Sequence, residues 1–238
     1  MILPSQKTVD EAYVKDYEQL YREVDADPEA FWGNIAHELS WFKPWKNILE
    51  WNFPYARWFT GGQCNIVHNA LDRHLKTETA DKIAYIWQSQ DGPARTFTYR
   101  QVNEEVSRLA NGLKSLGIRK GDKVSIYLPR IPEQLFAMLA CAKIGAVHLV
   151  VFSGFSAEAL KTRIIDGEAK LLITCDGYPY GKKFIELKKN ADSAITESSN
   201  DKIQMSNQIQ NPNVQNDKSA DTHSERPREV RSEVSTPS

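Results

Sequence analysis

The sequence predicts an α/β protein built around a partial parallel sheet. Three runs of mainly aliphatic residues, 123–128, 147–152 and 171–175, alternate with single helical stretches. Continuous aliphatic strands are typical of a parallel sheet that helices cover on both faces, whereas a half-exposed antiparallel strand alternates polar and apolar residues. We therefore predict a βαβαβ unit with right-handed crossovers.

The helices of this unit carry their own start and stop signals. Thr98 and Gln101 have the spacing of a capping box, and an apolar stripe with spacings of three and four follows until Gly117. Pro132 is placed to begin the next helix at its first position, and Ser156 to cap the one after it. Each cue is local, so these helices are predicted with defined starts.

The chain ahead of the sheet predicts a helical and irregular segment packed on it. The further expected elements are helices over 10–21, 28–39 and 66–74, and a hairpin of 82–87 with 94–98. Residues 41–65, "WFKPWKNILEWNFPYARWFTGGQCN", combine many Trp and Phe with two prolines, so we expect an irregular segment there. Its aromatic residues have two interpretations, as anchors for a long loop or as an aromatic ligand pocket.

Composition excludes several function classes. The formal net charge of −1 gives no electrostatic reason to expect a nucleic-acid or anionic-membrane partner. The three cysteines, Cys64, Cys141 and Cys175, have no CxxC or metal-ligand spacing, which favours a reducing cytoplasmic setting. The start, "MILPSQKTVDEAY", lacks the features of a signal peptide, and the longest apolar stretch, 146–152, is too short to span a bilayer.

Short catalytic motifs are missing from the sequence. It has no GxxxxGK[ST], GxGxxG or GxSxG, and no histidine pair has metal-ligand spacing. His148 begins a buried strand, and we expect a core or strand-edge histidine with an ordinary hydrogen bond. Ligands of parallel sheets bind beyond the carboxyl ends of the strands, which here are the loops 129–131, 152–156 and 176–183. Local patterns thus predict no more than a nucleotide-type ligand at those loops.

Three longer stretches carry a family resemblance. They are "WFKPWKNILEWNFPYARWFTGGQCNIVHNALDRHL", "GDKVSIYLPRIPEQLFAMLACAKIGAVHLVVFSGFSAEALKTRI" and "LLITCDGYPYGKKFIELKKNADSAI". In this order they resemble the N-terminal part of AMP-forming acetyl-CoA synthetases, in the acetyl- and propionyl-CoA synthetase branch of the acyl-adenylate-forming superfamily. The resemblance covers about residues 10 to 195. It implies an N-terminal region over 1–75 and a partial AMP-binding domain over 76–199.

The resemblance implies a two-step reaction. ATP and a short carboxylic acid, acetate or propionate, would give an acyl-adenylate and pyrophosphate, and the thiol of coenzyme A (CoA) would then displace AMP. Adenylation replaces a poor leaving group by a good one. Magnesium and positioned donors stabilise the charge that the phosphates carry. The implied partners are small molecules, with neither nucleic acid nor membrane among them.

The resemblance also implies a CoA site at two loops. The turn Phe152, Ser153 and Gly154 would lie against the adenine end of CoA, since small residues let a ligand approach the backbone; the family more often has Gly at the position of Ser153. The alternative for this turn is a tight strand-to-helix connection that touches no ligand.

A basic loop that holds the 3′-phosphate end forms the second part of the implied site. Its two arginine positions fall on Tyr180 and Lys183, and Tyr cannot supply the bidentate fork of Arg. Lys182 and Lys183 are the residues that would compensate. The alternative here is a solvated basic loop.

The remaining catalytic elements of the family are missing from the 238 residues. They are the phosphate loop ending in Pro-Lys-Gly, the acyl pocket, the ribose-binding Asp and the C-terminal domain with its lysine, so no catalytic residue and no metal site is assigned. Residues 200–238 contain no Phe, Trp or Tyr, and we expect a disordered tail outside the family. Two hypotheses follow: a truncated synthetase, inactive alone, or a non-catalytic CoA-binding module or half of a split enzyme, with a complementing C-terminal fragment.

Overall fold

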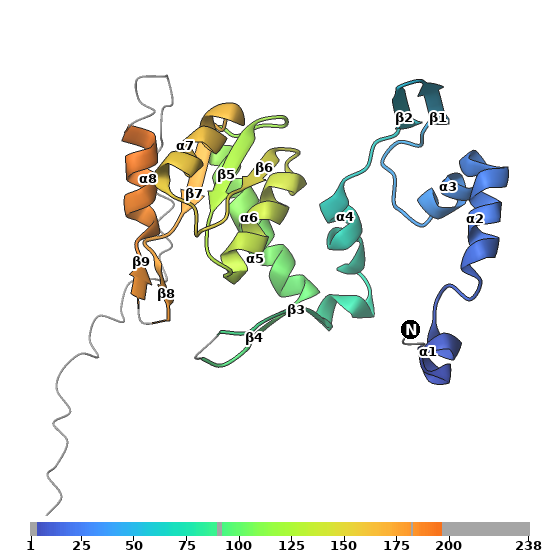
Figure 1. Cartoon of the computed structure of the whole chain (residues 1–238), viewed down its shortest axis with the longest axis horizontal. Helices are drawn as coiled ribbons and strands as arrows, with labels where there is room; N and C mark the ends of the chain where they lie inside the picture. The colour runs from blue at the N-terminus through green and yellow to red at the C-terminus, as the bar shows by residue number, and fades with distance from the viewer. Residues whose placement is uncertain (1–3, 90–91, 182, 197–238) are drawn as a thin grey trace, which may run out of the picture. The chain divides into compact units, whose positions relative to one another are not determined.

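The computed structural model describes residues 4–89, 92–181 and 183–196 (Figure 1). All of them belong to the first of two units of the chain, residues 1–206. The predicted tail 200–238 and Lys182 lie outside the described residues. No helix in the described ranges has the length and apolar character needed to cross a membrane.

Helices and short strands alternate along the described chain. In order, the elements are α1 (Gln6–Glu11), α2 (Tyr17–Ala26), α3 (Pro28–Ala36), β1 (Asn47–Asn52), β2 (Tyr55–Thr60), α4 (Ile66–Ala70), the 3₁₀ helices η1 (Asp72–His74) and η2 (Glu78–Asp81), β3 (Ile83–Trp87), β4 (Arg95–Thr98), α5 (Tyr99–Ser115), β5 (Lys123–Tyr127), α6 (Pro132–Lys143), β6 (Val147–Val150), α7 (Ala157–Asp166), β7 (Leu171–Thr174), β8 (Tyr178–Tyr180), β9 (Lys183–Ile185) and α8 (Leu187–Thr196).

The predicted α/β fold and its parallel sheet are confirmed. Strands β5, β6 and β7 form a sheet in the order β6-β5-β7, with both pairs parallel. Figure 1 shows α5 and α6 on one side of these strands and α7 and α8 on the other. Alternate residues of β5 follow this division, because Val124 and Ile126 pack among residues of α5 and α6, and Tyr127 among residues of α7 and α8.

The predicted helix signals are confirmed as well. Thr98 and Gln101 form a complete capping box at the start of α5. Gly117 follows the end of that helix with a φ of +86°, a left-handed conformation that favours glycine. Pro132 is the first residue of α6, and the hydroxyl of Ser156 accepts from the backbone N–H of Ala159, 3.3 Å away.

The N-terminal predictions need three corrections. The single helix over 10–21 is wrong, because Asp16 caps a separate helix, α2, by accepting from the N–H of Gln19 at 2.8 Å. The helix predicted over 28–39 ends at Ala36. The one predicted over 66–74 is split into α4 and η1.

The segment 41–65 is not irregular, which is a fourth correction in this region. Strands β1 and β2 pair antiparallel around a cis peptide bond at Phe53–Pro54. The rings of Trp41, Trp45 and Phe59 pack on one another with centroids 5.0–5.5 Å apart. Contacts among the rings themselves favour the interpretation of these aromatics as structural anchors.

Candidate functional site

The predicted turn after β6 is a compact connection into α7. The N–H of Phe155 donates to the carbonyl of Phe152, 3.0 Å away. Ser153 is buried, whereas the Phe152 side chain is 58% exposed. A Cβ on Gly154 would lie 2.6 Å from the Phe152 ring, so glycine is needed for this arrangement of the ring. The turn therefore presents an exposed aromatic ring that lies against the exposed backbone of Gly154.

Tyr127 on the central strand β5 is fully buried and forms hydrogen bonds with this turn. The hydroxyl of Tyr127 donates to the carbonyl of Phe155 at 2.8 Å, and the carbonyl of Ser153 lies 3.3 Å away. The side-chain amide of Asn190 on α8 donates to the same hydroxyl at 3.4 Å. Burial raises the pKa of Tyr127 above its ordinary value, so its hydroxyl keeps the proton that it donates.

The loop predicted over 176–183 is instead a hairpin, which is a further correction. Strands β8 and β9 pair antiparallel, with Tyr178 opposite Ile185 and Tyr180 opposite Lys183. Gly181 directly follows β8 with a φ of +58°, as hairpin connections often require. Strands of three residues, as in this hairpin, give little sequence signal. The helix α8 that follows the hairpin was not predicted either.

The structure brings the turn and the hairpin together. Ser153 Oγ donates to the hydroxyl of Tyr178 at 3.2 Å. Because side chains alternate along a strand, Tyr180 and its partner Lys183 lie on the same hairpin face as Tyr178, about 7 Å farther toward the tip. Tyr180 is 70% exposed and Lys183 is exposed. Five of the six predicted site residues thus lie on two directly bonded elements, and Lys182 lies outside the described residues.

The cysteine next to this site is not an activated nucleophile. Cys175 follows β7 and is partly buried, and burial raises the pKa of its thiol. A thiol needs a lowered pKa to react as thiolate at neutral pH. The groups exposed at the candidate site are the ring of Phe152, the backbone of Gly154 and the side chain of Lys183.

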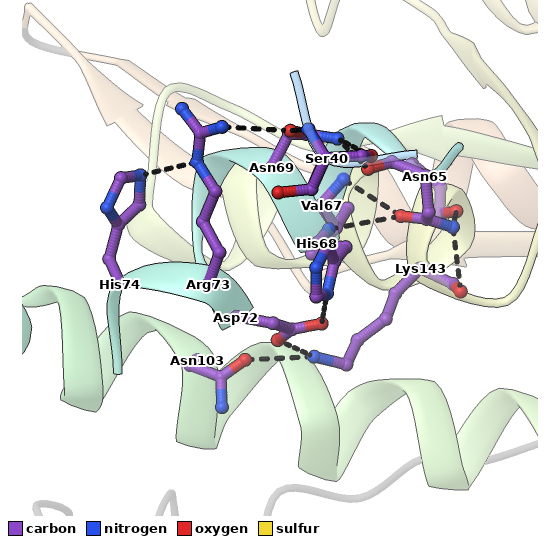
Figure 2. A network of polar contacts seen from close by, with 11 residues as sticks. Ser40, Asn65, Val67, His68, Asn69, Asp72, Arg73, His74, Asn103 and Lys143 are labelled. Carbon is purple, nitrogen blue, oxygen red and sulfur yellow. Dashed lines mark hydrogen bonds and ion pairs between the residues drawn. The ribbon is translucent and has the colours of Figure 1, made fainter. Parts of the chain in front are cut away.

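A second polar cluster, which sequence reasoning missed, joins α4 to α5 and α6 (Figure 2). The side-chain oxygen of Asn65 accepts from the N–H groups of Val67 and His68, while its amide nitrogen donates to the carbonyls of Ala142 and Lys143. One side chain thus caps the start of α4 and the end of α6. An Asn just before a helix is a visible N-cap signal, but its second role depends on contacts 77 and 78 residues away.

The ammonium group of Lys143 completes this cluster. It donates to a carboxylate oxygen of Asp72 at 2.6 Å and to the side-chain oxygen of Asn103 at 2.9 Å. His68 Nδ1 lies 3.9 Å from the other oxygen of Asp72. We call this cluster the joint, because it connects α4 to α5 and α6. Its donors and acceptors form hydrogen bonds and ion pairs with other groups of the protein.

His148 corrects a smaller prediction. Its Nδ1 is buried and has no hydrogen-bond partner among the described residues, so the ordinary hydrogen bond expected for it is not formed at this nitrogen. The parallel register places His148 opposite Val124, on an apolar part of the sheet. Strand position, rather than a polar partner, therefore accounts for its burial.

Comparison with known proteins gives the family. The model of the AMP-binding enzyme family matches residues 71–236, and that of the acetyl-coenzyme A synthetase N-terminus matches residues 17–70. The chain belongs to the AMP-binding enzyme family. The first match reaches into the segment from residue 200 on, which the sequence analysis placed outside the family. The joint of Figure 2 spans the border of the two matches, because Asn65 lies in one and Lys143 in the other.

Relatives of this AMP-binding chain are acetyl-coenzyme A synthetases. That of Deinococcus radiodurans is 51% identical over 180 residues, which are 75% of this chain and 28% of the relative. That of Methanothrix thermoacetophila is 54% identical over 167 residues, 69% of this chain and 25% of the relative. That of Rubrobacter xylanophilus is 47% identical over 196 residues, 82% of this chain and 30% of the relative. The chain thus spans between a quarter and a third of the length of these relatives.

Proposed function

We propose that this chain supplies the CoA-binding edge of an acetyl-CoA synthetase-like protein and does not adenylate a carboxylic acid by itself. The whole reaction would convert ATP, acetate or a similar short acid, and CoA into acyl-CoA, AMP and pyrophosphate. The observation that carries the proposal is the contact of the turn 152–154 with the β8–β9 hairpin, because it unites the two loops that the family resemblance assigns to CoA.

In the proposed complex each part of the site has one task. The exposed ring of Phe152 and the bare backbone at Gly154 receive the flat adenine. The ammonium group of Lys183 attracts the 3′-phosphate as a point charge, and Tyr180 contributes no charge where the family pattern has arginine. Lys182 is the second cation that we assign to this phosphate. The resulting affinity for CoA is weak.

The proposed lack of adenylation follows from chemistry that these residues cannot perform. The 238 residues contain no Pro-Lys-Gly phosphate loop, and ATP and magnesium are substrates that we assign to the rest of the protein. Removing a single oxyanion donor costs roughly 10²–10³-fold in rate, and here whole groups of donors are missing. We propose that the part of an acetyl-CoA synthetase-like protein outside these residues provides them.

The sheet supports a polypeptide partner over a free-standing CoA-binding module. Among the described residues, β6 pairs only with β5, and its other edge has no strand beside it. Val147 and Val150 on this strand are 47% and 45% exposed. We propose that polypeptide corresponding to the remaining length of an acetyl-coenzyme A synthetase covers this edge; the described chain matches 25–30% of its relatives.

The proposal also covers the domain division and the cellular location of the protein. We propose an N-terminal region over 1–75, a partial AMP-binding domain over 76–199 and a tail over 200–238. The three cysteines form no disulfide, which suits a cytoplasmic protein.

Two measurements on the purified chain test the proposal. Calorimetric titration should show weak binding of CoA, and ATP–pyrophosphate exchange with acetate or propionate should stay at the level of a blank. Adding the remaining length of the Methanothrix thermoacetophila relative should produce exchange and a larger species on size-exclusion chromatography. Exchange by the pure chain alone, or a folded chain that binds no CoA, would show the proposal to be wrong.

A further inference from the structure

Buried hydroxyl groups tie the turn to the hairpin. Ser153 Oγ donates to Tyr178 Oη, and Tyr127 Oη, which donates to the carbonyl of Phe155, accepts from the side chain of Asn190. The hydroxyl of Tyr127 also lies 3.3 Å from the carbonyl of Ser153, so these bonds meet at the turn after β6 and link it to the central strand, the hairpin and α8.

The Ser153–Tyr178 contact depends on the serine hydroxyl in the turn. Ser153 is 7% exposed, and a buried hydroxyl is costly unless it has a hydrogen-bond partner. The family resemblance gives glycine more often at this position, and glycine has no hydroxyl to donate. A serine here therefore creates a bond between the turn and the hairpin that a glycine could not form.

The register of the hairpin relates this bond to the residues at the hairpin tip. Tyr178 lies on the same face as Tyr180 and Lys183, two positions away along β8. Fixing Tyr178 against Ser153 thus fixes where the Lys183 side chain begins relative to the turn. Without the bond, only the packing of Tyr178 and Ile185 against the core would hold the hairpin here, and the ammonium group would sample a wider range of distances from the ring of Phe152.

We propose that Ser153 and Tyr178 are positioning residues, whose hydrogen bond sets the spacing between the turn and Lys183. A ligand with a flat adenine at one end and a 3′-phosphate at the other is then recognised as a unit. The inference rests on the proposed binding of CoA and deepens it, because it predicts selectivity for the 3′-phosphate from two residues that do not touch that phosphate.

The experiment compares CoA with dephospho-CoA, which lacks only the 3′-phosphate. The full chain and the variants Tyr178→Phe and Ser153→Gly are titrated with both ligands by calorimetry, and Tyr85→Phe, in the strand β3, is the matched control. Wild type should prefer CoA by roughly ten-fold, the factor of one charge-assisted hydrogen bond. The preference should fall to roughly two- to three-fold in both site variants and stay at the wild-type value in Tyr85→Phe.

The outcomes separate this inference from the proposed function. A general loosening of the fold would weaken both ligands equally and leave their ratio unchanged. An unchanged ratio in folded Ser153→Gly or Tyr178→Phe, or an equal fall in Tyr85→Phe, would overturn the positioning role alone. If folded wild type bound neither ligand, the proposed function would fail, and the positioning role with it. Ser153→Gly decides the question should Tyr178→Phe not fold.

Discussion

Tyr180 and Lys183 face each other across the β8–β9 hairpin, an uncharged ring opposite a cation at the tip. Both are exposed, and they occupy the two positions that the family resemblance assigns to arginine. The pair therefore carries one positive charge where the resemblance implies two, and the weak phosphate contact that we propose can be tested directly.

Changing Tyr180 to Arg should strengthen CoA binding. A charge-assisted hydrogen bond to phosphate contributes about 1.5–3 kcal/mol, so Tyr180→Arg should raise the affinity by up to roughly ten- to a hundred-fold. Lys183→Ala should lower it, and the Arg variant should show a steeper dependence on salt. Titration calorimetry at two ionic strengths measures both effects. Tyr180→Phe is the control, and it should bind as wild type does; an Arg variant that bound no better than this control would contradict the assignment of the hairpin.

Asn65 should contribute more to stability than an exposed asparagine. Asn65→Ala removes the cap of α4 together with two donors to the end of α6, and should lower the free energy of unfolding by about 2 kcal/mol. Asn34→Ala, at an exposed position inside α3, should change it by less than about 0.5 kcal/mol. Urea unfolding monitored by circular dichroism gives both values. Equal losses in the two variants would mean that the joint of Figure 2 is energetically unimportant.

Local cues account for what the sequence predicted, and long-range contacts for what it did not. The strands β5, β6 and β7 are continuous aliphatic runs, and Thr98, Pro132 and Ser156 mark helix starts within a few residues of themselves, so each was predicted correctly. The contact of the hairpin β8–β9 with the turn joins Tyr178 to Ser153, 25 positions away. No periodicity of a three-residue strand indicates such a contact.

The N-terminal region shows the same limit. Prolines and aromatic residues in 41–65 suggested an irregular segment, but Trp58 of β2 packs against Trp32 of α3, with ring centroids 6.3 Å apart. Packing between elements therefore favours a paired hairpin over the conformation that composition alone suggested. Similarly, the apolar context of Tyr127 predicted a buried strand residue, but not that its hydroxyl would hold the turn at Phe155, 28 positions away.

Replacing each of two buried serines with alanine should change the free energy of unfolding in opposite directions. Ser125 is 0% exposed and its hydroxyl has no partner among the described residues, so Ser125→Ala should raise the free energy of unfolding by about 1 kcal/mol. Ser153 is also buried, with 7% exposed, but donates to Tyr178, so Ser153→Ala should lower the free energy of unfolding by about 1 kcal/mol. Denaturant midpoints at constant m-value measure the pair. A loss of stability in both variants would show that the Ser125 hydroxyl is satisfied in solution.

Cys141 should make the protein less stable in alkaline solution. Its side chain is fully buried in the cluster between α5 and α6, and burial raises the pKa of the thiol from 9.0 to about 11. The unfolded chain releases this proton at a lower pH than the folded chain does. The stability that is linked to the protonated thiol is therefore fully present below pH 9 and is lost as the pH rises toward about 11. The loss should approach about 3 kcal/mol, at about 1.4 kcal/mol for each unit of pKa.

Urea unfolding at about pH 8 and about pH 10.5 measures the pH-dependent loss of stability. The same measurement on Cys141→Ala shows how much of this loss comes from other titrating groups, Tyr127 among them. The wild type should lose more stability than the variant over this interval, and equal losses would mean that the thiol ionises in the folded protein as it does in the unfolded chain.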